Sequence, residues 1–226
     1  MNTPENFTHV VAVGVDIQND FTPGGSLAVA GGDEVVRPFN NVANWVRYET
    51  GLVVFTRDWH PEETNHFGNP PNFNTTWPVH CVANTLGAQF HPDLDVTEHD
   101  TVMSKGMEKD EDAYSGFQAH AHNGSTLETI IYPVRHDRVA VFIGGLATDY
   151  CVKATVLDAL KYADKFEDDP LRDVDVFVLA DAIRAVDPFK GFGAVEEMKS
   201  AGARFVTSDE VVNNQVANVR EYQWNH

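Results

Sequence analysis

The chain has 226 residues, 42% of them hydrophobic, and its 34 acidic side chains against 16 Lys and Arg give a formal net charge of −18. This length fits a single α/β domain, which we expect to span residues 1–226, with a sizeable core. The negative charge argues against nucleic acid and anionic membrane as partners, because both would repel it.

Six apolar runs predict the strands of a parallel sheet. Each run is rich in β-branched residues and almost continuously apolar, as a strand covered by helices on both faces has to be. In chain order they are residues 9–17, 51–58, 100–106 (the weakest), 138–146, 175–183 and 203–208.

Helical patterns alternate with these strands. In residues 33–49 apolar side chains recur on one stripe, and Pro38 inside the stripe predicts a start near Arg37 or a kink. Further helices are expected at residues 126–135, 149–163 and 189–201. This alternation predicts an α/β fold with an open, doubly wound, mostly parallel six-stranded sheet and helices on both faces.

Two stretches interrupt the alternation. Residues 59–99 are polar and loop-like and hold five of the ten histidines. Long loops in compact domains are usually functional, so we expect an insertion here that carries ligands. Residues 165–175 are acidic and carry no recognisable chemistry, which predicts a surface excursion.

Reactive residues follow three of the predicted strands, at the sheet edge where α/β proteins bind ligands. They are Asp16, Lys105 and Cys151, the last in "GGLATDYC" at the start of a helix. The helix N-terminus and a nearby lysine favour a thiolate, and the first-turn N–H groups can hold an oxyanion. We expect Cys151 to be a nucleophile, Asp16 to move its proton, and Lys105 to keep Asp16 ionised and lower the thiol pKa. A packed, inert thiol beside a structural ion pair is the alternative.

Metal-ligand types gather around the long loop. Asp58 and His60 stand two residues apart, so an extended chain places both side chains on one side. His66 and His80 follow in the loop, and one carboxylate with three imidazoles suits zinc, iron or manganese. His91 is the substitute if one of these fails to ligate. The neighbouring Asp20 is expected to support a turn rather than to react.

Five motifs resemble the nicotinamidases of the isochorismatase-like cysteine hydrolase superfamily, over about residues 11–206. The motifs are "VDIQNDF", "TRDWHPEETNHF", "WPVHCV", "SKG" followed by "DAYSGF", and "GGLATDYCV". The first alone indicates only the superfamily. The acid, lysine and cysteine together indicate its amidases, and "DWH" with "WPVHC" indicates the nicotinamidases.

The resemblance implies roles for residues of this chain. It implies a triad of Asp16, Lys105 and Cys151, an oxyanion hole from the N–H groups of Ala147 and Cys151, and a cis peptide between Leu146 and Ala147. It implies a metal held by Asp58, His60 and His80, with a ligand that varies across the family at His66. It implies pocket walls at Phe21, Trp77 and Tyr114. Extra residues between Lys105 and Tyr114 depart from the family and affect the placing of Tyr114.

The implied activity is hydrolysis of nicotinamide to nicotinate and ammonia through a cysteine thioester, with one divalent metal ion positioning the substrate. Pyrazinamide is an expected further substrate. The alternative is another cysteine amidase of the superfamily, acting on a carbamoyl or ureido substrate. A metal-binding protein with an inert triad is a more distant alternative. A dinucleotide-binding redox protein is another, but the first predicted strand of this chain is not followed by the G-x-G-x-x-G turn that binds the phosphates of a dinucleotide.

The remaining expectations concern the surroundings of the protein. The sequence shows neither a signal peptide nor a run of about 20 apolar residues, so we expect no membrane association. Two cysteines make no disulfide framework, which favours the reducing cytoplasm. Small molecules are the expected partners, and the oligomeric state, a homo-oligomer included, is left open.

Overall fold

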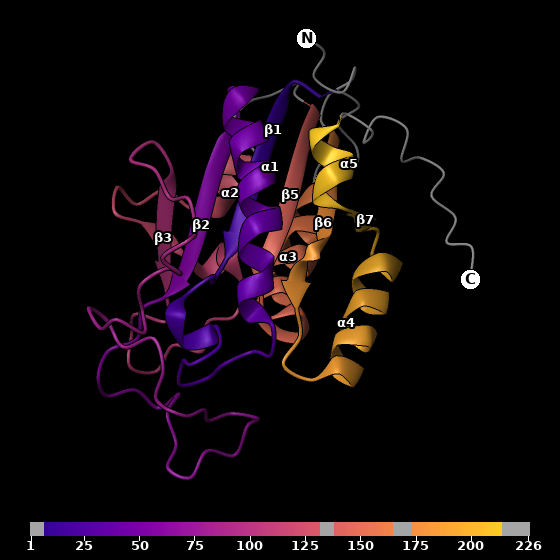
Figure 1. Cartoon of the computed structure of the whole chain (residues 1–226). Coiled ribbons are helices and arrows are strands. Elements are labelled where there is room, and N and C mark those ends of the chain that lie inside the picture. Colours follow the sequence, from indigo (N-terminus) through magenta and orange to yellow (C-terminus); the bar gives the residue numbers. More distant parts are fainter. Residues whose placement is uncertain (1–6, 132–137, 165–172, 214–226) are drawn as a thin grey trace.

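A seven-stranded sheet forms the centre of the protein (Figure 1), in a computed structural model that describes residues 7–131, 138–164 and 173–213. The strand order is β4-β3-β2-β1-β5-β6-β7, and every neighbouring pair is parallel except β3 and β4. The strands are β1 His9–Val15, β2 Leu52–Asp58, β3 Thr101–Lys105, β4 His120–Ala121, β5 Arg138–Leu146, β6 Asp173–Arg184 and β7 Arg204–Val206. The mostly parallel α/β sheet is therefore confirmed.

The predicted number of strands was wrong by one. The additional strand, β4, has two residues and pairs antiparallel with the edge strand β3, through Met103–Ala121 and Ser104–His120. Two residues are too few to show an alternating pattern in a sequence. The acidic stretch 165–175 lies mostly outside the described residues, and its last three residues belong to β6 rather than to an excursion.

The helices follow the predicted alternation. They are α1 Val36–Tyr48, α2 Leu127–Ile131, α3 Lys153–Asp164, α4 Pro188–Ser200 and the unpredicted five-residue α5 Ser208–Val212. Pro38 lies in the first turn of α1, where a missing N–H breaks no helical hydrogen bond. The predicted continuation of α2 to residue 135 falls outside the described residues. Among the helices that the structure describes, none is long and apolar enough to cross a bilayer.

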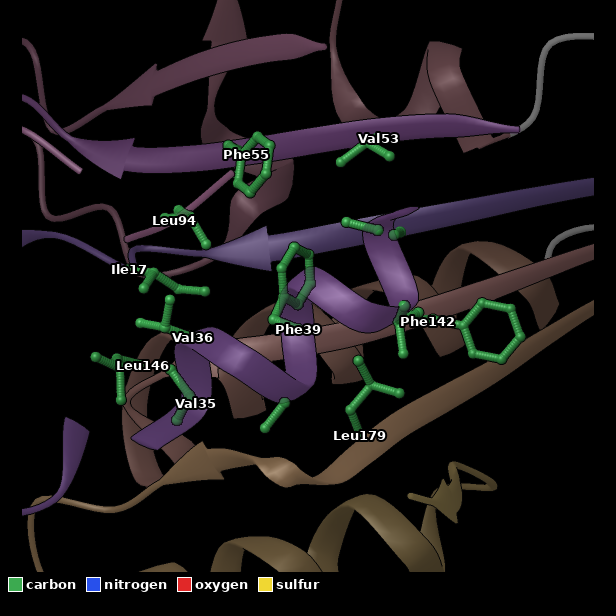
Figure 2. Close-up of a cluster of buried hydrophobic side chains, with 14 of the residues drawn as sticks. Ile17, Val35, Val36, Phe39, Val53, Phe55, Leu94, Phe142, Leu146 and Leu179 are labelled. Carbon is green, nitrogen blue, oxygen red and sulfur yellow. The ribbon is translucent and has the colours of Figure 1, made fainter. Parts of the chain in front are cut away.

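Helices cover both faces of the sheet, as its buried strands require. Along β1, Val10 and Ala12 point into a core shared with α1 and α5, and Val11 and Val13 point into a core shared with α2 and α3. Figure 2 shows the first core, with Phe39 of α1 packed on the sheet. Helix α4 packs beside α3. Two cores hold the central strands rigidly, and with them the residues at their ends.

The connection between β2 and β3 is long and irregular. Residues 59–99 contain isolated bridges, such as His60–Val82 and Phe67–Trp77, and form loops at the lower end of the sheet in Figure 1. Strand β1 pairs with β2 on one side and with β5 on the other. The chain therefore reverses its winding direction beside β1, and ligands of open α/β sheets bind at such a point.

Candidate active site

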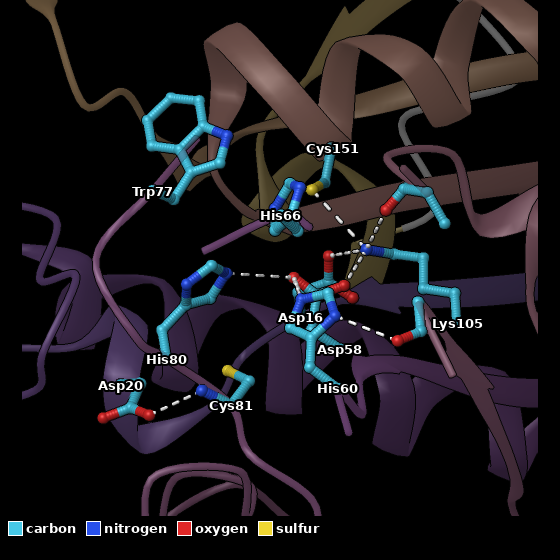
Figure 3. Close-up of polar contacts among 12 residues, drawn as sticks. Asp16, Asp20, Asp58, His60, His66, Trp77, His80, Cys81, Lys105 and Cys151 are labelled. Carbon is cyan, nitrogen blue, oxygen red and sulfur yellow. Dashed lines mark hydrogen bonds and ion pairs between the residues drawn. The ribbon is translucent and has the colours of Figure 1, made fainter. Parts of the chain in front are cut away.

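Three strand ends bring Asp16, Lys105 and Cys151 together (Figure 3). The Lys105 Nζ atom lies 2.9 Å from Asp16 Oδ2 and 3.6 Å from Cys151 Sγ. The same ammonium contacts Asp58 Oδ1 and donates to the Ala113 carbonyl at 3.1 Å. Neither Asp16 nor the Lys105 ammonium group is accessible to solvent. The predicted meeting of acid, lysine and cysteine is thus present in the structure.

The position of Asp16 follows from its backbone. Its φ of 49° turns the chain out of β1, a conformation that aspartate tolerates better than most residues do. The Thr56 hydroxyl donates to Asp16 Oδ1 at 2.7 Å and fixes the carboxylate. One oxygen is thereby held by Thr56, and the other faces Lys105.

Cys151 lies in a π-helical turn, Thr148–Val152, that follows β5 and leads into α3. The Thr155 hydroxyl donates to the Cys151 carbonyl at 2.7 Å and accepts from Gly116 N–H at 2.8 Å. This ties the turn to the loop after Tyr114. The peptide bond between Leu146 and Ala147 is cis, as the resemblance implied. The oxyanion role of Ala147 and Cys151 stays a prediction.

Burial reverses one electrostatic expectation. It raises the pKa of the Cys151 thiol well above its ordinary value, although Lys105 acts to lower it. Burial also raises the pKa of Asp16, and the opposing effect of Lys105 is smaller. Lys105 lowers the thiol pKa as predicted, but burial outweighs its effect, so the net shift is upward. Burial thus shifts the pKa of both Cys151 and Asp16 upward, and Lys105 opposes both shifts.

Three histidines surround Asp58 on the side away from Lys105. One nitrogen each of His60, His66 and His80 lies within 4.8 Å of the others, and all three rings are buried. The Nε2 atoms of His60 and His80 lie 3.7 and 3.9 Å from Asp58 Oδ2. Their Nδ1 atoms lie 2.9 Å from the Gly106 carbonyl and 2.7 Å from the Pro78 carbonyl. Each Nε2 atom is therefore left to face the carboxylate.

The histidine cluster fits a divalent metal ion. His60 Nε2 is buried without a hydrogen-bond partner, an arrangement that is costly unless an ion or water completes it. Burial lowers the pKa of His80 to about 4, so its ring is a neutral lone-pair donor at neutral pH. Metal-bound histidines typically give their other nitrogen to a carbonyl or carboxylate, as both rings do here.

Asp58 belongs to both groups. Burial alone would raise the pKa of its carboxyl, but Lys105 and His60 outweigh burial and hold the pKa below its usual range. The carboxylate therefore lies between the Lys105 ammonium group on one side and the histidine cluster on the other. His66 completes the set, and its Nδ1 atom lies 3.2 Å from Asp112 Oδ1 in the loop after β3.

A small pocket, partly open to solvent, lies over these groups. The three implied wall residues Phe21, Trp77 and Tyr114 all line it, and the Trp77 ring N–H donates to the Tyr114 hydroxyl at 3.1 Å. Sequence reasoning missed Tyr150, whose ring centroid lies 5.0 Å from that of Trp77. It also missed the apolar lining residues Leu27, Val29, Leu146 and Val186. Of these residues, Tyr150 could have been predicted from the sequence, because it directly precedes the proposed nucleophile Cys151.

Two further predictions concern residues beside the cluster. His91 is not needed as a ligand, since it accepts from the Asp93 N–H at 3.2 Å and lies outside the histidine group. Asp20 supports a turn, as expected: its carboxylate accepts from Cys81 N–H at 2.7 Å and from Ser26 N–H at 3.2 Å. Asp20 thereby links the turn after β1 to the residue that follows His80.

Comparisons with known proteins agree on one family. The model of the Isochorismatase domain matches residues 10–210. The nicotinamidase/pyrazinamidase of Mycobacterium tuberculosis is 37% identical over 86% of this chain and 96% of its own. The pyrazinamidase of Pyrococcus horikoshii, solved in complex with zinc, is 38% identical over 88% of this chain and 99% of its own, with a TM-score of 0.73. PnC1 from L. infantum, solved in complex with nicotinate, is 32% identical over 89% of this chain and 94% of its own, with a TM-score of 0.72.

Proposed function

The chain belongs to the isochorismatase family, and on this premise we propose that it hydrolyses nicotinamide to nicotinate and ammonia through a Cys151 thioester. It is an amidohydrolase. The observation that carries the proposal is the single ammonium group of Lys105 held between Asp16 Oδ2 at 2.9 Å and Cys151 Sγ at 3.6 Å. The nicotinamidase and nicotinate-bound relatives support the choice of substrate.

In the proposed reaction Asp16 carries one proton during formation of the thioester and a second during its hydrolysis. Asp16 takes the thiol proton, and Cys151 Sγ attacks the carboxamide carbon while the N–H groups of Ala147 and Cys151 hold the oxyanion. Loss of one such donor typically costs about 3 kcal/mol of barrier. Asp16 then gives its proton to the departing ammonia. A water, deprotonated by Asp16, next attacks the thioester, and nicotinate leaves as the Cys151 thiol re-forms.

The pocket suits a flat heteroaromatic amide. Phe21 and Trp77 offer apolar ring surfaces for the pyridine, and Tyr114 closes the wall behind Trp77. Asp58, His60, His66 and His80 would hold one divalent metal ion, zinc, iron or manganese, whose chemistry when bound is to coordinate a ring nitrogen as a Lewis acid. The zinc complex of the Pyrococcus horikoshii relative supports a divalent metal at this site. Pyrazinamide, which also carries a ring nitrogen, is the proposed second substrate.

Two further proposals concern the domain organisation and the cellular compartment. Residues 1–226 form one hydrolase domain in which residues 59–99 are a metal-binding loop insertion, and the match over residues 10–210 supports this. The cytoplasm is the proposed compartment, because both Cys81 and Cys151 are free thiols. Light scattering would measure the oligomeric state, for which a homo-oligomer is one of the alternatives.

Ammonia release tests the substrate directly. The full chain is loaded with zinc, manganese or ferrous iron and is given nicotinamide, pyrazinamide and, separately, a carbamoyl and a ureido amide. We expect turnover of the two heteroaromatic amides and a transient thioester in quenched mass spectra. Turnover of the carbamoyl or ureido amide alone would replace the proposed substrate by that of the alternative amidase.

A further inference from the structure

The end of β2 has an unusual partner. Pairing between β1 and β2 ends at Val15 and Thr56, followed by one bond from Asp16 N–H to the Thr56 carbonyl. Asp58 is the last residue of β2, two residues beyond Thr56, and β1 no longer pairs with β2 there. Its buried main-chain N–H and C=O groups therefore need other hydrogen-bond partners. The Gln18 side chain supplies them. Its Oε1 accepts from Asp58 N–H at 2.8 Å, and its Nε2 donates to the Asp58 carbonyl at 2.8 Å.

Both N–H donors of the Gln18 amide are used, and its oxygen accepts one bond. Its Nε2 also donates to the Ala88 carbonyl at 2.9 Å, and the side chain is inaccessible to solvent. The two bonds to Asp58 reproduce the pairing that a neighbouring strand would make, and the third reaches the 59–99 loop. Glutamate of the same length would lack both donors, and asparagine is one methylene shorter. The site therefore requires both the length and the amide of glutamine.

Gln18 holds the residue on which the triad and the histidines both depend. Asp58 Oδ1 accepts a hydrogen bond from the Lys105 ammonium group, and Asp58 Oδ2 lies 3.7 Å from His60 Nε2. A rotation of the Asp58 main chain would move both oxygens at once. We propose that Gln18 is a positioning residue that aligns the Asp58 carboxylate for metal binding and for Lys105, an inference that rests on the proposed function. Gln18 acts through Asp58 and touches neither the substrate nor the metal.

Zinc affinity separates positioning from plain stability. Gln18→Met keeps the length and loses all three bonds, and Gln18→Glu keeps the shape and loses both donors. Ser208→Ala is the control: it removes a partly buried side-chain hydrogen bond of a buried residue, the one from Ser208 Oγ to Asp181 Oδ2 at 2.5 Å, and Ser208 does not line the pocket. Calorimetric titration of the metal-free full chain with zinc gives Kd, and thermal unfolding gives Tm for each variant.

We expect both Gln18 variants to raise the zinc Kd by about 10- to 100-fold, as loss of groups that orient metal ligands does. Ser208→Ala should lower Tm while keeping the wild-type Kd. A wild-type Kd in Gln18→Met, at a Tm loss like that of Ser208→Ala, would make Gln18 merely structural and overturn the proposal. If Gln18→Met does not fold, Gln18→Asn carries the same test, because its shorter amide cannot reach both groups of Asp58. A wild-type chain that binds zinc but leaves nicotinamide intact would refute the proposed function alone.

Discussion

The proposed triad and the histidine cluster lie side by side but are held in different ways. Asp16, Lys105 and Cys151 follow or end strands of the sheet, whose pairing and two cores fix their backbones. His66 and His80 lie on the irregular 59–99 loop, and the His80 ring is oriented by one bond to the Pro78 carbonyl. The positions of the triad residues thus depend on the pairing and packing of the sheet, whereas the positions of the loop histidines depend on local hydrogen bonds.

This difference predicts that the two regions fail separately. A change at a strand end should lower the rate of the chemical step and leave metal binding intact. A change in the histidine cluster should lower metal content and substrate affinity and leave the thiol chemistry intact. Asp58 is the exception, because its carboxylate is shared. Four substitutions test whether the triad and the histidine cluster can be impaired independently.

Cys151→Ala has the largest expected effect. It removes the nucleophile, and turnover should fall by at least about 10⁴-fold, because no other group can form the covalent intermediate. Zinc Kd and Tm should stay near those of the wild type, measured by calorimetry. Retention of even a tenth of the wild-type rate would reject the covalent route.

Asp16→Asn keeps the shape and removes the base. We expect kcat to fall by about 10²- to 10⁴-fold, the usual contribution of a general acid–base group. The zinc Kd is the internal control and should not change, because Asp58 still faces the histidines. A parallel loss of zinc affinity would show that the two regions are not separable.

His60→Ala tests the other region. Metal content after dialysis, measured by atomic absorption, should fall, and KM should rise by at least about tenfold, since one metal ligand is lost. Alkylation of Cys151 by iodoacetamide should proceed at the wild-type rate. An unchanged metal content would remove His60 from the ligand set. Chelation of the wild-type chain should reproduce the rise in KM.

Thr155→Val should have the smallest effect. It leaves the Gly116 N–H without its acceptor and the Cys151 carbonyl without its hydroxyl donor. An unsatisfied buried group costs about 1–3 kcal/mol, which urea unfolding would measure. The kcat should fall by less than in Asp16→Asn, because the turn that carries Cys151 loosens without losing a reacting group. An effect on zinc Kd is not expected.

The sequence predicted most of the sheet and the meeting of the reactive residues, because parallel strands place their ends at one edge. It could not predict β4, whose two residues carry no periodic signal. It predicted that Lys105 lowers the pKa of the Cys151 thiol but missed the larger, opposite effect of burial, which depends on packing that only the fold shows. Gln18 was missed for a related reason: a side chain that bonds to a distant main chain leaves no pattern in the sequence.

Gly145 carries a consequence for natural variation in this chain. Its φ of 127° disfavours side chains, and a Cβ atom there would overlap the Val15 carbonyl of the adjacent strand. Gly145 has no proposed role in the reaction, yet alleles that replace it should lose activity, because the added side chain would disturb the pairing of β5 with β1. In a genetic screen for loss of activity, Gly145 alleles should yield little folded protein, whereas alleles that remove the Cys151 sulfur should yield folded but inactive protein.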